Sequence, residues 1–426
     1  MLVSLGRIGQ IGTPARHKAG APLAERIVAT RGRTAQGEQT VFSSRSIAVG
    51  RERIIIGEDC AAIKVRYLAW IQLAADPGER PITNAVTIQA VGLEKADGSL
   101  TVPMLFAGAA TALLDPTSTD KFMDTDYLPA TALGLSKFSR GEEYFIRTQA
   151  NCGATNSKYP VNNRLQQPGE GNVVYAVGTS GAPTAYGTGA VTTGTGIVST
   201  HSVTPQAVFG RTSGRVRAYV ALGDSLTDET NDANTTDKAG RGFAQRAALD
   251  ASGLNPLGNV VHGIGGSTLK AFATNTSLRS LVYQNVDTAV LCLGTNDVSD
   301  VASTPENMRD YARQVRAQLA AGGVKRIIQL LPATRVTAAT ATLAPADQVV
   351  YDANWDTGGL MDQFRAAVAP DVGSQHLDVL LDARDYICDA SDRRKFASGM
   401  VHTDGLHWVA AAHVLIAQAV RAAILG

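Results

Sequence analysis

The feature that most constrains the fold is a segment, 217–222, in which the residues alternate and then become continuously apolar. It ends at a glycine and is followed directly by Asp224 and Ser225. This composition is typical of a central parallel strand that is buried on both faces. Gly223 allows the sharp exit that the chain needs at the end of such a strand. Since ligands bind at the carboxyl ends of parallel strands, Ser225 is a candidate nucleophile there, although serine is also an ordinary turn residue.

The sequence after Ser225 alternates between expected strands and helices. We expect strands at 259–261, 288–293, 326–331 and 376–380, and helices at 243–249, 305–319, 348–369 and 408–424. Such alternation predicts an α/β fold with a parallel sheet covered by helices on both faces. Right-handed crossovers bring all the carboxyl ends of the strands to one edge, so we expect the loops at that edge to converge on Ser225.

The first half of the chain has a different pattern, in which apolar and polar residues alternate with a period of two. This pattern, with an Asp-Gly turn signal inside a hairpin expected at 93–102, predicts an all-β domain of the antiparallel sandwich or jelly-roll type. A run rich in Gly, Thr and Ser at about 178–205 is typical of a connecting loop. We therefore expect a β-rich N-terminal domain at 1–210 and a second, α/β domain at 211–426.

Charge and hydropathy exclude several classes of partner. The net charge is +1, from 39 basic and 38 acidic residues, so we expect neither a nucleic-acid partner nor a polybasic membrane signal. The first residues lack the apolar core of a secretory signal. Polar residues interrupt the apolar stretch 409–425, so we expect no membrane span. The prediction is a soluble protein, which is secreted or periplasmic if a signal has been removed and otherwise cytoplasmic.

The cysteines suggest neither a metal site nor a redox motif. Cys60, Cys152, Cys292 and Cys388 lack the spacing of zinc ligands or of a CxxC pair. A bridge between Cys60 and Cys152 and a set of free buried thiols both remain open.

Three more segments with polar or glycine residues lie near the ends of expected elements in the second half, at 262–268, 294–297 and 404–407. Each has an ordinary structural interpretation, because glycines permit turns, Asn and Asp cap helices, and a lone histidine is often structural. Together with Ser225, however, they contain every group that acyl transfer requires.

The roles follow from the chemistry of that reaction. Ser225 would attack a carbonyl carbon, and His407 would remove its proton and later protonate the leaving alcohol. Asp404 would hold the imidazole in the required tautomer. The backbone N–H groups of Ser225 and Gly266, with the side-chain amide of Asn296, would stabilise the oxyanion.

These segments resemble the sequence blocks of the SGNH (GDSL-type) hydrolase superfamily. Residues 223–226 read Gly-Asp-Ser-Leu, and 263–266, 294–297 and 404–407 resemble three further blocks of that family. The resemblance covers about 215–426 and implies a flavodoxin-like α/β/α sandwich that hydrolyses esters without metal or cofactor. It also implies Ser225 as the nucleophile. An N-terminal β-sandwich is similar to that of some secreted members.

Several residues have competing interpretations. His402 is the main rival to His407 as the base, and His262 is a candidate pocket wall beside Gly266. Trp355 is a candidate wall of the acyl pocket or a core residue. The segment Thr227-Asp228-Glu229 is more acidic than the family pattern, and we expect it to influence what enters the site.

The leading functional hypothesis is a serine esterase that acts on short-chain acyl esters, with carbohydrate acetyl esters as one substrate class. One alternative is a lipase or thioesterase that acts on longer acyl chains. A second alternative is a catalytically inert carbohydrate-binding protein. Transfer of the acyl group to an alcohol instead of water and the oligomeric state both stay open.

Overall fold

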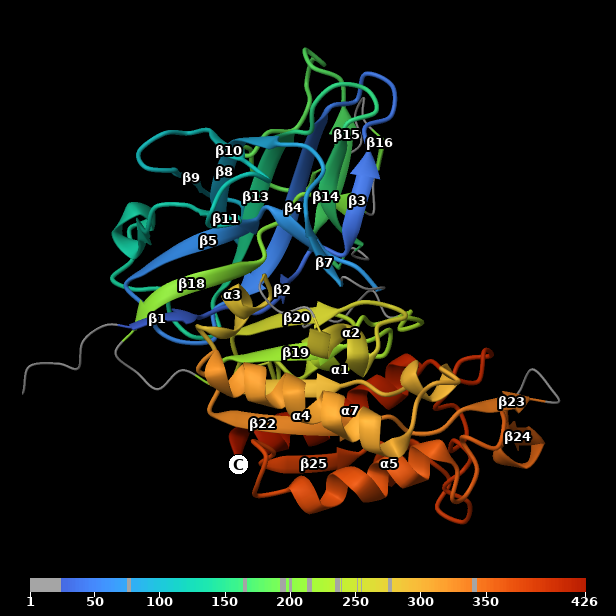
Figure 1. Cartoon of the computed structure of the whole chain (residues 1–426). Helices are drawn as coiled ribbons and strands as arrows, with labels where there is room; N and C mark the ends of the chain where they lie inside the picture. The colour runs from blue at the N-terminus through green and yellow to red at the C-terminus, as the bar shows by residue number, and fades with distance from the viewer. Residues whose placement is uncertain are drawn as a thin grey trace, which may run out of the picture.

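The computed structural model describes residues 24–426 except 75–77, 164–166, 192–196, 199–200, 213–216, 234–237, 239, 251, 254, 275–277 and 339–342. The segment searched for a secretory signal therefore lies outside the described residues, as do parts of the expected connecting loop at 178–205. Figure 1 shows a β-rich N-terminal half packed on one side of a layered C-terminal half.

The N-terminal half is all-β, as predicted. Three of its sheets have the strand orders β1-β18-β5-β11, β10-β8-β13-β4-β15-β16 and β17-β14-β3, with β12 and β9 paired at the sides of β5 and β8. The strands are β1 (Ala24–Ile27), β3 (Gly37–Thr40), β4 (Ile47–Ile55), β5 (Ala62–Leu68), β6 (Trp70–Gln72), β7 (Glu79–Pro81), β8 (Val86–Lys95), β9 (Thr101–Met104), β10 (Ala112–Leu114), β11 (Phe122–Asp124), β12 (Leu128–Pro129), β13 (Glu143–Asn151), β14 (Lys158–Asn163), β15 (Gly171–Tyr175), β16 (Ile197–Val198), β17 (His201–Ser202) and β18 (Ala207–Thr212).

The alternating pattern that predicted these strands also builds their core. Strands β8 and β9 form the expected antiparallel hairpin, in which Leu93 pairs with Val102. Alternate apolar side chains of the strands, among them Ile63, Val65 and Val91, pack into one buried cluster. The four cysteines are free thiols, so Cys60 and Cys152 are not bridged.

The C-terminal half is the predicted α/β/α sandwich. Its sheet has the order β2-β20-β19-β21-β22-β25, and all its strand pairs are parallel. Its strands are β2 (Gly32–Arg33), β19 (Tyr219–Gly223), β20 (Asn259–Gly263), β21 (Thr288–Cys292), β22 (Arg326–Leu331) and β25 (Val379–Asp382). The helices are α1 (Gly242–Arg246), α2 (Leu269–Thr274), α3 (Ser280–Tyr283), α4 (Pro305–Ala321), α5 (Leu360–Val368), α6 (Arg384–Ile387) and α7 (Ala410–Leu425), and short 3-10 helices lie at Ala130–Leu133, Asp297–Ser299, Pro345–Asp347 and Ala369–Asp371.

The expected helix at 348–369 is wrong over its first half. Residues Gln348–Val350 form β24, which pairs with β23 (Val336–Ala338), and the helix itself is only α5. Asp, Asn and Gly residues between β24 and α5 favour turns, because their side chains or backbone satisfy local hydrogen bonds outside a helix. The last strand is also displaced, since β25 runs from Val379 to Asp382.

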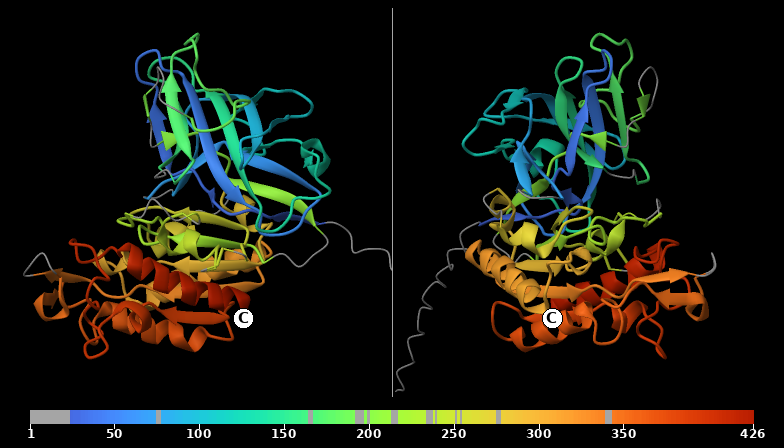
Figure 2. Two further views of the ribbon diagram at one scale, coloured as in Figure 1. Left: turned by 180° about the vertical axis from the view of Figure 1, so that it is seen from behind. Right: turned by 45° about the vertical axis from the view of Figure 1, so that its right-hand side comes forward.

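One strand of the C-terminal sheet comes from the N-terminal half. Strand β2 pairs in parallel with β20, so that Gly32 lies opposite Val260 and Arg33 opposite Val261. Figure 1 shows this strand at the junction of the two halves, and Figure 2 shows from two other sides that the halves pack against each other there. The division at residue 210 stays a prediction; β18 continues through that position to Thr212.

Candidate active site

Ser225 begins a tight turn at the carboxyl end of the central strand β19. The backbone N–H groups of Asp228 and Thr230 donate to the carbonyl groups of Asp224 (2.9 Å) and Ser225 (3.1 Å). A Cβ atom at Gly223 would lie 2.4 Å from the Cys292 carbonyl oxygen, so only glycine fits where the strand meets this turn. The strand and its glycine exit therefore position the serine as the sequence predicted.

The loop before α7 brings a histidine and an aspartate to this serine. His407 Nε2 lies 2.8 Å from Ser225 Oγ, and His407 Nδ1 lies 2.8 Å from Asp404 Oδ2. The three side chains thus form one continuous hydrogen-bonded chain, although 182 positions separate Ser225 from His407. This is the arrangement by which a carboxylate orients an imidazole that activates a hydroxyl group.

Asp404 is held in its ionised form. Burial alone would raise the pKa of Asp404, but hydrogen bonds from the Leu406 and His407 amides, together with the His407 side chain, lower that pKa to about 2. Both amide nitrogen atoms lie 3.0 Å from Asp404 Oδ1. The carboxylate therefore keeps its charge, and its other oxygen atom is directed at the imidazole.

The loop that carries Asp404 and His407 can take only a glycine at its second position. Gly405 has a φ of +70°, and a Cβ atom there would lie 1.7 Å from the carbonyl oxygen of Val336. The Val336 N–H in turn donates to the Gly405 carbonyl group at 2.9 Å. Strand β23 thus fixes the loop from one side.

His402, the rival base, lies against the same carboxylate and not against the serine. Its Nδ1 atom is 3.3 Å from Asp404 Oδ2. Asn231 Nδ2 also donates to Asp404 Oδ2, at 2.7 Å, and lies 3.1 Å from His402 Nδ1. Sequence reasoning missed Asn231, because nothing in its local pattern indicates a contact with a residue 173 positions away.

The three candidate oxyanion donors come from adjacent strand ends. Asn296 Nδ2 donates to the Ser267 carbonyl group at 2.9 Å, and the same amide nitrogen carries a second N–H. Gly266 has a φ of +84°, which favours glycine. Within the described residues, the backbone N–H groups of Ser225 and Gly266 donate to no protein acceptor. They are therefore free to bind a substrate oxygen.

Two buried carboxyl groups lie beneath these loops. Asp297 accepts hydrogen bonds from the Leu269 N–H at 3.0 and 2.9 Å, so it braces the start of α2 as a cap, and burial raises its pKa to about 6. Asp224 is fully buried and accepts from the Leu226 N–H at 3.0 Å; burial raises its pKa to about 7.

This shift gives a testable pH dependence. A carboxyl group whose pKa rises from 3.8 to about 7 on folding contributes stability at low pH, and this contribution is lost as the pH rises through that interval. Asp224→Asn removes the ionisation. We therefore expect the melting temperature of the variant, relative to that of wild type, to increase from about pH 5 to about pH 8. A difference that is constant with pH would contradict the raised pKa.

Two expectations about pocket residues are wrong. Asp228 and Glu229 do not face an open site, because both are paired with the buried side chain of Arg33. His262 does not line a pocket: it is completely buried, its Nδ1 atom lies 2.8 Å from Thr34 Oγ1, and burial lowers its pKa. Both partners come from the N-terminal half, which the sequence pattern could not connect to these loops.

A polar cavity with a volume of about 200 Å³ opens at the same edge of the sheet. Thr334 lines it, and Val336, two residues further on, contacts Gly405 in the loop that carries Asp404 and His407. Trp355 also lines this cavity, and its indole N–H has no hydrogen-bond partner among the described residues. The Trp355 side chain belongs at the same time to a hydrophobic core cluster. The other lining residues are mostly charged or hydroxylated: Ala333, Thr357, Asp362, Arg365, Arg384, Ser391, Asp392, Arg393 and Arg394.

Comparison with known families agrees with this geometry. Residues 221–415 match the model of the GDSL-like Lipase/Acylhydrolase family. The C-terminal half of this chain is therefore a GDSL-like hydrolase domain. The match begins inside β19 and ends inside α7, so it includes Ser225, Gly266, Asn296, Asp404 and His407. The GDSL-type chain is accordingly a carboxylic ester hydrolase.

Solved structures similar to this GDSL-type chain include a G-D-S-L family protein from Desulfitobacterium hafniense DCB-2, which is 11% identical, covers 49% of this chain and 99% of its own, and has a TM-score of 0.36. A family two carbohydrate esterase from Clostridium thermocellum is 12% identical, covers 95% of this chain and 92% of its own, and has a TM-score of 0.35. At these scores neither similarity carries an argument. No curated protein matches the chain significantly. Among the described helices, none has the length and apolar character that a membrane crossing needs.

Proposed function

We propose that this chain is a serine esterase in which Ser225 is the nucleophile, His407 the general base and acid, and Asp404 the group that orients the imidazole. The observation that carries the proposal is the hydrogen-bonded chain from Ser225 Oγ through His407 to Asp404, with 2.8 Å at each step. Ser225 Oγ attacks the ester carbonyl carbon while His407 Nε2 takes its proton, and His407 then protonates the leaving alkoxide.

The tetrahedral intermediate carries a negative charge on the former carbonyl oxygen. The backbone N–H groups of Ser225 and Gly266 and the second amide N–H of Asn296 are the donors that we assign to this oxygen. Water then attacks the acyl-enzyme, with His407 again as the base, and Ser225 is released. The ionised Asp404 stabilises the imidazolium that forms in both halves of the reaction.

We further propose a short acyl chain and a polar alcohol for the substrate, with carbohydrate acetyl esters as the first class to test. The support is the polar cavity after β22 and β25, which the segment from Thr334 to Val336 links to Gly405. Its arginine, carboxylate and hydroxyl side chains suit a hydroxylated or charged leaving group. A lipase or thioesterase would need an apolar surface for a long chain, and this lining favours the polar substrate. The β-rich domain at 1–210 would shape the cleft of the catalytic domain at 211–426 or bind polymer.

A series of p-nitrophenyl esters from acetate to palmitate tests the acyl preference. We expect kcat/KM to be highest for acetate and to fall by medium chain length, because the cavity that we assign to substrate is polar. The kcat/KM for acetylated sugars would then be compared with that for ethyl acetate, because both are acetate esters and differ in whether the leaving alcohol is a polar sugar or a simple alkanol. Preference for palmitate would move the assignment to a lipase or thioesterase, and no activity on any ester would favour the inert binding protein.

A further inference from the structure

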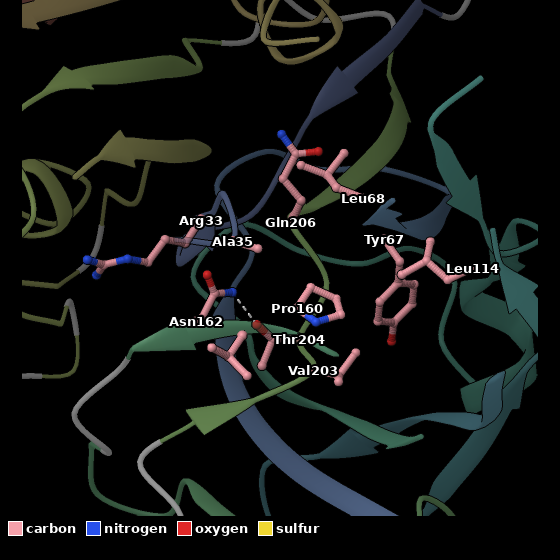
Figure 3. Close-up of a pocket in the computed structure, with 11 residues that line it drawn as sticks. Arg33, Ala35, Tyr67, Leu68, Leu114, Pro160, Asn162, Val203, Thr204 and Gln206 are labelled. Atoms are coloured by element: carbon pink, nitrogen blue, oxygen red, sulfur yellow. Dashed lines mark hydrogen bonds between the residues drawn. The ribbon is translucent and has the colours of Figure 1, made fainter. Parts of the chain in front are cut away.

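The turn that carries Ser225 is held by an arginine from the other half of the chain. Arg33 lies in β2 and is fully buried, with 1% of its side chain exposed. Its Nη1 atom lies 2.8 Å from Glu229 Oε1, and Nη2 contacts both the carboxylate and, at 3.2 Å, the carbonyl oxygen of Asp228. Figure 3 shows the Arg33 side chain extended away from a small cavity of the N-terminal half and toward the strands of the C-terminal sheet.

A second residue of the same segment contacts both the nucleophile turn and the loop of the oxyanion glycine. Gln36 Nε2 donates to the carbonyl oxygen of Gly263 at 2.6 Å and also to the Asp228 carboxylate. Gly263 lies three residues before Gly266. One amide from the N-terminal half therefore fixes the two loops against each other.

The turn that Arg33 and Gln36 hold is strained, and it leads to the carboxylate of Asp404. Glu229 and Asn231 have φ values of 64° and 66°, in the left-handed region that non-glycine residues seldom adopt. Such a conformation persists where surrounding contacts impose it, and the ion pair of Glu229 with Arg33 is such a contact. Two residues after Glu229, Asn231 donates to Asp404 Oδ2 at 2.7 Å. The turn thus begins at the nucleophile and ends on the carboxylate that orients the base.

We propose that Arg33 and Gln36 are positioning residues of the esterase, which hold the turn at 225–231 so that Ser225 and, through Asn231, Asp404 are aligned with His407. This inference rests on the proposed roles of those three residues. It makes the N-terminal half a part of the catalytic centre. A planar guanidinium group can bind two carboxylates in fixed directions, whereas an ammonium group acts as a point charge.

The test compares Arg33→Lys and Gln36→Ala with a matched control, Arg316→Lys. Arg316 is also fully buried and also binds a carboxylate, that of Asp371, but it lies on α4 and contacts no residue of the turn. We expect Arg33→Lys and Gln36→Ala to lower kcat on p-nitrophenyl acetate by about tenfold or more with little change in KM, because misalignment affects the transition state. Arg316→Lys should lower the melting temperature and leave kcat within about twofold of wild type.

A double-mutant cycle separates positioning from general stability. If Arg33 acts through the turn, Asn231→Ala should lower kcat by itself. The fold reduction in kcat of the double variant Arg33→Lys/Asn231→Ala should then be smaller than the product of the fold reductions of the two single variants, since both substitutions act on one element. Should Arg33→Lys fail to fold, Gln36→Ala decides alone, because Gln36 is only partly buried.

Wild-type kcat in Gln36→Ala and in any folded Arg33→Lys, or multiplicative effects in the cycle, would overturn the inference. The rate at which a p-nitrophenyl phosphonate modifies Ser225 gives a second readout, which should fall in parallel with kcat. Ser225→Ala is assayed beside these variants. If it keeps its activity, the proposed nucleophile is wrong whatever the Arg33 and Gln36 variants show.

Discussion

Replacement of Ser225 by alanine is expected to lower kcat by about a thousandfold or more. The variant keeps the turn but loses the Ser225 hydroxyl oxygen, which lies 2.8 Å from His407 Nε2. No acyl-enzyme can then form, and what remains is the small acceleration that oxyanion donors and binding give to attack by water. Steady-state hydrolysis of p-nitrophenyl acetate measures the loss, with the melting temperature as the check on folding.

The matched control for this substitution is Ser99→Ala. Ser99 is an exposed serine in the turn between β8 and β9, and its backbone N–H donates to Asp97 at 2.9 Å. Removing its hydroxyl should leave kcat unchanged. Turnover in Ser225→Ala within about tenfold of wild type would reject Ser225 as the nucleophile.

The sequence was most informative where local chemistry determines structure. The apolar segment before Gly223 predicted β19. Helix α4 begins at Pro305, and the preceding Thr304 caps it, because the Thr304 hydroxyl oxygen accepts a hydrogen bond from the Asn307 N–H at 3.2 Å. Signals of this kind need only a few neighbouring residues. The five candidate site residues could be proposed for the same reason, since each follows a short and recognisable local pattern.

The contacts that the sequence could not reveal are the long-range ones. Arg33 and Asp228 are 195 positions apart, and β2 has two residues, which is too short for any periodicity. Asp228 and Glu229 therefore looked like acidic residues at a pocket mouth, when they are the buried partners of one guanidinium group. The first half of the expected helix at 348–369 was wrong for a related reason, because the antiparallel pairing of β24 with β23 depends on tertiary context.

These long-range contacts change how the two halves relate to each other. A β-rich domain that merely binds polymer would need only a flexible connection to the hydrolase. Here β2 completes an edge of the catalytic sheet, and Thr34 contacts the buried His262 at the end of β20. Ala74 also lies close to Gly266, since a Cβ atom on that glycine would be 3.5 Å from Ala74 Cβ. The N-terminal half therefore borders both the nucleophile turn and the proposed oxyanion hole.

Asn296→Ala is expected to lower kcat by roughly a hundredfold, the usual effect of losing one oxyanion donor. KM should change little, because the donor is directed at the charge that develops in the transition state and contributes less to binding the neutral ester. Asn307→Ala is the matched control, since this asparagine caps α4 and its loss should affect the melting temperature alone. Asn296 also braces Ser267 at 2.9 Å, so the melting temperature of Asn296→Ala must be measured with its kinetics. A rise in KM at constant kcat would assign Asn296 to ground-state binding and leave Ser225 and Gly266 as the oxyanion donors.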